Sequence, residues 1–221
     1  MNILMEGLTS VPLFVTYFTL MDYACRKLRL KNTYYIVHAI HNAIITVLTA
    51  PDVYHSFTDL YNIRAYPTNW LAIKLCLALH LYHIMLYYEA FRFDDWLHHG
   101  LMIGFALPIG SFLEAHTFMG FSLFFTTGLP GGIDYALLAL VRNEVIPKSL
   151  EKAVNAWLNV WIRSPGCMAM AALSTANFLS SKIPLHPLML IPCLLNYWNG
   201  QYFMRQVVED YARFQIQRVP T

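Results

Sequence analysis

The most informative part of this sequence reads ALHLYH (residues 78–83), MLYYEA (85–90) and FDDWLHHG (93–100). Two histidine pairs, His80 with His83 and His98 with His99, stand on consecutive apolar segments that a short acidic turn separates. Ionisable side chains are costly in lipid hydrocarbon, so their presence there calls for a partner or a function. This stretch is therefore the first candidate for a reaction centre.

The composition is that of a membrane protein. Of the 221 residues, 57% are hydrophobic and only 13% are charged, and the mean hydropathy is +0.43, whereas soluble domains carry roughly 25% charged residues. A net charge of +2 is too small to indicate nucleic-acid binding. The four cysteines form no C-x-x-C pair, so we expect them to be packing residues rather than disulfides or zinc ligands.

Seven apolar segments follow one another along the chain, with a loop over 51–67 as the longest connection. Because a membrane span needs about 20 residues, we predict an all-α, polytopic transmembrane bundle of seven spans that forms a single domain over residues 1–221. The predicted spans are 8–24, 33–50, 69–88, 94–112, 117–140, 151–179 and 185–204.

The basic residues fall almost entirely on one side of these seven spans. With the N-terminus outside, eleven Lys and Arg residues lie inside and only Arg64 and Lys182 lie outside. This asymmetry favours an N-out, C-in orientation. The inside residues are Arg26, Lys27, Arg29, Lys31, Arg92, Arg142, Lys148, Lys152, Arg205, Arg213 and Arg218.

The alternating direction of the spans gives the polar side chains a common depth. Four spans carry them in their inner halves, and residues three apart share one helix face. We therefore expect one polar cavity in the inner leaflet. Its predicted members are His38, His41, His80, His83, His98, His99 and Asp134.

Three chemical interpretations of the histidines remain open. One histidine of the His98–His99 pair could act as a general base that Asp134 or Asp95 orients, since histidine titrates near working pH. Clustered imidazoles could instead ligate a metal, although the segment lacks the first histidine of an H-x-x-H-H box. Finally, the histidines could be hydrogen-bonding groups between packed helices.

Two further features belong to the later spans. Pro130, among three glycines at 128–132, is expected to break its helix, which a membrane tolerates only beside protein or a water-filled cavity. Arg163 lies deep in its span, and a buried guanidinium needs an anionic partner, for which Asp134 or a lipid phosphate is a candidate.

The run from Tyr87 through Asp94-Asp95-Trp96-Leu97-His98-His99 resembles the core of the TLC family of ceramide-synthase-like membrane proteins, with TTGLPGGIDY (126–135) similar to the break in its next helix. The resemblance covers about 35–202. It implies acyl transfer from acyl-CoA to a sphingoid base, with His98 and His99 as catalytic candidates and an aspartate supporting them. The family's acidic stretch after the break is missing here.

From these features we predict a TLC-like multi-pass membrane protein that handles acyl or sphingoid lipids, as an acyl-CoA-dependent N-acyltransferase if it is an enzyme. The alternative is a non-catalytic accessory subunit of a larger membrane complex. The catalytic candidates are His98, His99, Asp95 and Asp134, and the substrate-binding candidates are His80, His83, His38, His41 and Arg163. We expect no metal and no cofactor beyond acyl-CoA as a co-substrate, membrane lipids and other subunits as partners, and an endoplasmic-reticulum or organellar membrane as the location.

Overall fold

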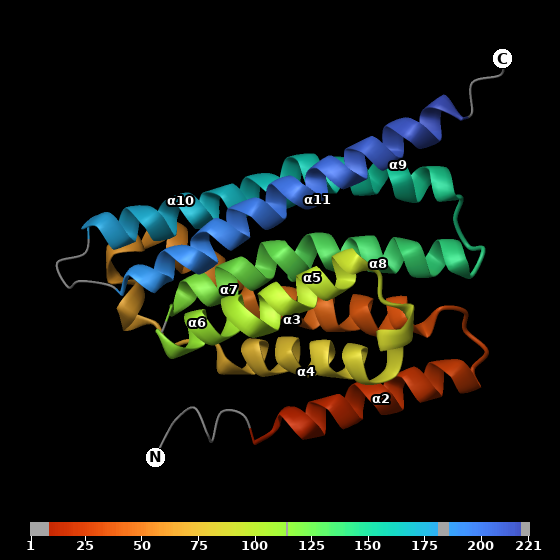
Figure 1. Ribbon diagram of the computed structural model, residues 1–221, viewed down its shortest axis with the longest axis horizontal. Coiled ribbons are helices and arrows are strands. Elements are labelled where there is room, and N and C mark those ends of the chain that lie inside the picture. Colours follow the sequence, from red (N-terminus) through yellow and green to blue (C-terminus); the bar gives the residue numbers. More distant parts are fainter. Residues whose placement is uncertain (1–8, 114, 181–185, 218–221) are drawn as a thin grey trace.

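The computed structural model describes residues 9–113, 115–180 and 186–217. This part of the chain forms seven helical rods that run back and forth in one bundle, which confirms the all-helical class (Figure 1). The rods are α2 (Val11–Lys27), α3 (Thr33–Thr58), α4 (Trp70–Tyr87), α5–η3–α6 (Phe93–Leu101, Met102–Ala106, Leu107–Phe112), α7–η4–α8 (Thr117–Leu123, Phe124–Gly128, Leu129–Arg142), α9–η5–α10 (Lys148–Leu158, Asn159–Arg163, Ser164–Ser180) and α11 (Leu190–Ile216). Short 3₁₀ turns, η1 (Leu60–Ala65), η2 (Tyr88–Ala90) and η6 (Pro187–Met189), lie in the connections.

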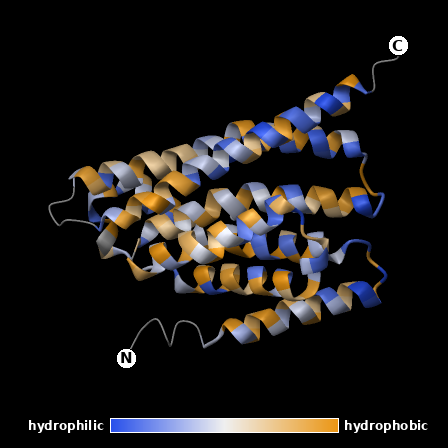
Figure 2. Ribbon diagram, in the orientation of Figure 1, coloured by the Kyte–Doolittle hydropathy of each residue, from blue (hydrophilic) through white to orange (hydrophobic). Residues whose placement is uncertain are grey.

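Three of the described helices are long and apolar enough to cross a membrane: Thr33–Thr58, Trp70–Ala90 and Thr117–Arg142. Figure 2 shows apolar residues along much of every rod, with hydrophilic residues gathering toward the end of the bundle that holds the C-terminus. A transmembrane protein is therefore supported, while membrane crossing by the other four rods stays a prediction.

Two rods, α3 and α11, extend furthest beyond the predicted spans. Helix α3 continues through Pro51 to Thr58, so much of the predicted 51–67 loop is helical. Helix α11 continues past Met204 to Ile216, because Glu209 pairs with Arg205 and Arg213, each one helical turn away. Some sequence-based predictions fall on parts of the chain that the structure does not describe. These are the predicted starts of two spans, at Leu8 and Leu185, and the positions of three basic side chains, Arg64, Lys182 and Arg218.

Three rods contain a π-helical turn, and each turn ends two residues before a proline. The turns η3, η4 and η5 precede Pro108, Pro130 and Pro165. Proline lacks an N–H group and clashes with the carbonyl four residues earlier, and a wider turn relieves that clash while the rod continues. The predicted break at Pro130 is thus a π-turn inside a continuous rod rather than an interruption.

Polar contacts join the rods at the end that holds the C-terminus. Lys31, after α2, pairs with Glu144, after α8, at 2.6 Å. Asp22 of α2 accepts a hydrogen bond from the Tyr87 hydroxyl of α4 at 3.0 Å. Lys152 of α9 pairs with Asp210 of α11. The ends of these rods that carry the basic clusters therefore lie together.

Candidate functional site

A polar cavity of about 210 Å³ lies inside the bundle, among α3, α4, α5, η4–α8, η5 and α11. All three π-turns contribute to its wall or lie beside it, as π-turns often do at functional sites. The predicted residues on its wall are His38, His80, His83, His98, His99, Asp95, Asp134 and Arg163. The structure thus gathers eight of the nine predicted site residues around one space.

Three of these histidines form a hydrogen bond from Nδ1 to the backbone of their own helix, which orients the imidazole ring. Nδ1 of His38, His80 and His99 lies 2.8, 2.7 and 2.6 Å from the backbone oxygen of the residue four positions earlier. A carbonyl oxygen only accepts, so Nδ1 carries the hydrogen in each ring. Their Nε2 atoms, in the neutral form, therefore carry lone pairs.

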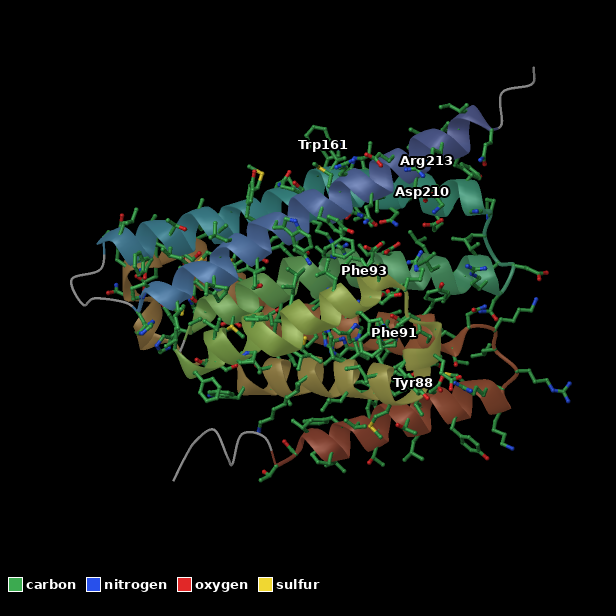
Figure 3. The ribbon with its side chains drawn as sticks, in the orientation of Figure 1. Tyr88, Phe91, Phe93, Trp161, Asp210 and Arg213 are labelled. Carbon is green, nitrogen blue, oxygen red and sulfur yellow. The ribbon has the colours of Figure 1, made fainter. Side chains whose placement is uncertain are left out.

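Two contacts between histidines follow from this assignment. Nδ1 of His83 lies 3.0 Å from Nε2 of His99, so His83 donates and His99 accepts. Nε2 of His98 lies 3.3 Å from Nε2 of His80, so His98 donates and His80 accepts. Phe91, which is labelled in Figure 3 and lies in the connection between η2 and α5, packs against the rings of His83 and His99.

The adjacent histidines consequently differ in what they can do. His99 is only 5% exposed and uses both ring nitrogens in hydrogen bonds. His98 is partly exposed and uses only Nε2, which leaves the lone pair of Nδ1 without a partner among the described residues. Of the two adjacent residues, His98 is therefore the one with a free proton acceptor, and His99 links α5 to α4.

The acidic candidates take separate places around the cavity. The Asp95 carboxylate accepts a hydrogen bond from the Arg92 backbone N–H at 2.8 Å, so it caps α5, and the Asp95 backbone oxygen orients His99. Asp94 accepts from the Tyr202 hydroxyl of α11 at 2.7 Å. Oδ1 of Asp134 is buried with no hydrogen-bond partner in the part of the chain described.

Arg163 lines the cavity and forms no ion pair with any residue that the structure describes. It is 8% exposed, its guanidinium lies over the Phe203 ring at 5.7 Å, and its Nε has no hydrogen-bond partner among the described residues. Asp134, proposed as its partner from the sequence, lines the same cavity but forms no salt bridge with it.

His41 is the predicted site residue that the structure places outside the cavity. It is fully buried, packs edge-on against Phe18 of α2, and bonds through Nδ1 to Oδ1 of Asn42 at 2.8 Å. A helix turns about 100° per residue, so three residues leave His41 about 60° away from His38. Asn42, one residue further, returns to the face of His38 and lines the cavity.

A narrow apolar chamber adjoins the polar cavity. It runs among α5–η3–α6, α7, α10 and α11 and has about 70 Å³ of free space. The two spaces share the residues Asp94, His98, Met102, Thr126, Asn199 and Phe203. At its other end the chamber meets a second cavity of about 230 Å³ through Ala115, Phe118, Ser174, Met189 and Cys193.

The sequence-based prediction missed several residues that build this region. The rings of Tyr34 and Tyr135 pack at a tilt against His38, Asn42 and Phe203 complete the wall, and Tyr202 donates a hydrogen bond to Asp94. Tyr34 and Asn42 lie one turn before and after His38, so helical spacing could have found them. Phe203 and Tyr202 come from a distant rod, and no local pattern points to them.

Among the described residues, no group of three or more His, Cys, Asp or Glu side chains is arranged to hold a metal ion. All four cysteines are free and buried, as the spacing predicts. Comparisons with protein-family models, with curated proteins and with solved structures found no match to this chain.

Proposed function

We propose that this membrane protein binds a long-chain lipid and transfers an acyl group from acyl-CoA to the amine of a sphingoid-type base. The observation that carries the proposal is the position of His98, which lies on the wall shared by the apolar chamber and the polar cavity. An amphiphile with its chain in the chamber presents its polar end to this histidine.

The chamber suits an acyl chain in length and in lining. On the side of α11 its wall runs from Met189 to Phe203, which at 1.5 Å per residue spans about 20 Å. This exceeds the roughly 15 Å of hydrocarbon in one leaflet. Four methionines line the narrow space, and their flexible side chains can move aside for a chain. They are Met102, Met119, Met170 and Met189.

His98 supplies the proton transfer that this reaction needs. As the amine nitrogen attacks the thioester carbonyl carbon, Nδ1 of His98 takes the proton that the nitrogen loses. The carbon–sulfur bond then breaks, and the thiolate of CoA leaves with that proton. His80, His83 and His99 hold His98 and its surroundings, because their hydrogen bonds link α4 to α5. Catalysis by His98 follows the TLC resemblance, with His99 in a positioning role.

The proposal includes the setting of the protein. All seven rods cross an endoplasmic-reticulum or organellar membrane with the N-terminus outside and the C-terminus inside. The basic residues at the end of the bundle that holds the C-terminus support this orientation. Acyl-CoA then reaches the polar cavity from the inner face.

The test is an acyl-transfer assay with purified full-chain protein in neutral detergent, palmitoyl-CoA and sphinganine, with the N-acyl product measured by mass spectrometry. We expect His98→Ala to lower the rate by about 100-fold or more, the typical contribution of a general base. Trp161→Ala is the matched control, since Trp161 is 65% exposed and points away from the bundle (Figure 3). An unchanged rate in His98→Ala refutes catalysis by His98, and lipid binding without turnover in the wild-type protein favours the accessory subunit.

A further inference from the structure

Within the described part of the chain, two buried hydrogen-bond donors on the wall of the polar cavity have no acceptor. Nδ2 of Asn42 and Nε of Arg163 are buried and unpartnered in the part of the chain that the structure describes, and both residues line the cavity. A buried donor without an acceptor destabilises the protein, and a buried unpaired charge destabilises it more. Both groups therefore call for a ligand that accepts hydrogen bonds.

The orientation of the Asn42 amide is fixed by its other atom. Oδ1 accepts from Nδ1 of His41 at 2.8 Å and from the Thr127 hydroxyl at 3.1 Å. Two donors fill the acceptor capacity of this oxygen, so the amide cannot rotate without losing both hydrogen bonds. His41, although it lies outside the cavity, thus positions Asn42.

Gly131 lets the backbone of α8 lie close to the side chains of Asn42 and Arg163. A Cβ atom at Gly131 would lie 2.8 Å from Nδ2 of Asn42 and 3.5 Å from Nη2 of Arg163. The glycine sits in the first turn of α8, on the cavity wall. The Asn42 amide and the Arg163 guanidinium thus lie beside one glycine on the cavity wall, and together they form a cradle that offers hydrogen bonds to a ligand oxygen in the cavity.

We infer that Asn42, Arg163 and Gly131 form an oxyanion site that holds the carboxylate, phosphate or thioester oxygen at the polar end of an acyl-chain ligand. The inference rests on the proposed binding of a chain in the apolar chamber, and it goes further by giving the ligand a negatively charged or polarised oxygen. Arg163 supplies the only positive charge that faces this cradle in the described part of the wall, apart from the exposed Arg92 at its rim.

The acidic group nearest this cradle does not fill it. Asp134 lies three residues beyond Gly131 on α8 and lines the same cavity, but it forms no salt bridge with Arg163. Its buried Oδ1 is an acceptor without a donor. A ligand end that combines an oxyanion with an N–H or O–H group would satisfy the cradle and Asp134 together.

Two amphiphiles that have hydrocarbon chains of the same length but different polar ends test the inference. Purified full-chain protein in neutral detergent is titrated with palmitate and with hexadecanol, and both dissociation constants are measured by calorimetry. Because charge-assisted hydrogen bonds are worth about 1.5–3 kcal/mol, we expect palmitate to bind about 10- to 100-fold more tightly. Hexadecyl phosphate and acetate, as further probes, separate a phosphate from a carboxylate end and a lipid from a free anion.

Substitutions in the proposed oxyanion site test whether this site causes the tighter binding of palmitate than of hexadecanol. Gly131→Ala adds a Cβ that displaces the Asn42 amide, Asn42→Asp replaces the donor with an acceptor, and Arg163→Met removes the charge. Each should bring the two dissociation constants within about threefold of each other. Gly132→Ala is the matched control, because its added Cβ meets only ordinary contacts, 3.4 Å or more away, and it should keep the preference. Helical circular dichroism and retained hexadecanol binding identify the variants that fold.

Three results overturn the inference. Equal binding of palmitate and hexadecanol by the wild-type protein removes the oxyanion site but leaves chain binding in place. A preference that survives in Gly131→Ala and Asn42→Asp places the site elsewhere. Absence of binding by either amphiphile removes the chain chamber, and the oxyanion site falls with it.

Discussion

We predict that His99 contributes more than His98 to the stability of the fold, whereas His98 serves the function. His99→Ala removes two buried hydrogen bonds, one to the Asp95 backbone oxygen and one from His83. At a net value of about 0.5–1.5 kcal/mol each, their loss amounts to about 1–3 kcal/mol. His98→Ala removes one longer bond, to His80 at 3.3 Å, and leaves a partly exposed site, so we expect a cost of less than about 1 kcal/mol.

The assay is thermal unfolding in neutral detergent, followed by tryptophan fluorescence at one fixed scan rate. For a chain of this length, 1 kcal/mol corresponds to about 2–4 °C. We expect His99→Ala to unfold about 2–12 °C below wild type and His98→Ala to stay within about 4 °C. A larger loss of stability in His98→Ala than in His99→Ala would refute the division of roles between the two residues.

Two further predictions concern the packing of the rods and one ion pair. Gly166→Ala drives a methyl group into the Phe125 ring and should cost about 1–3 kcal/mol in unfolding scans, whereas Gly100→Ala, with open space around it, should cost nothing. Lys31 lowers the pKa of the exposed Glu144 below its ordinary 4.5, so their ion pair stabilises the fold above that pH and is lost as pH falls through the lower folded-state pKa. Melting temperatures of wild type and Glu144→Gln should therefore converge in acid, and a constant difference down to pH 3 would contradict this assignment.

The course of the rods could be predicted because apolar runs of membrane-span length are a strong local signal. The gathering of His38, His80, His83, His98 and His99 could also be predicted. Because successive rods run in opposite directions, residues that are equally far along the sequence from the connections at one end of the bundle lie at a similar depth. These inferences needed only sequence spacing and the distribution of charge.

The features that could not be predicted depend on contacts between distant rods. The pairing of His98 with His80, which frees Nδ1 of His98, is set by how α5 packs on α4. The unpaired state of Arg163 is equally invisible in the sequence, where Asp134 looked like its partner. The π-turns are an intermediate case, since Pro108, Pro130 and Pro165 mark their positions but not whether the helix breaks or widens.

Photoaffinity labelling tests most directly whether the apolar chamber holds a chain whose polar end lies at His98. A palmitate analogue with a diazirine near its methyl end is cross-linked to the full-chain protein, and the labelled peptides are mapped by mass spectrometry. We predict labels at the far end of the chamber, around Met170, Met189 and Cys193, and we expect excess palmitate to abolish them. Labels confined to outward-facing residues such as Leu194, 68% exposed, with no competition by palmitate, would contradict this prediction.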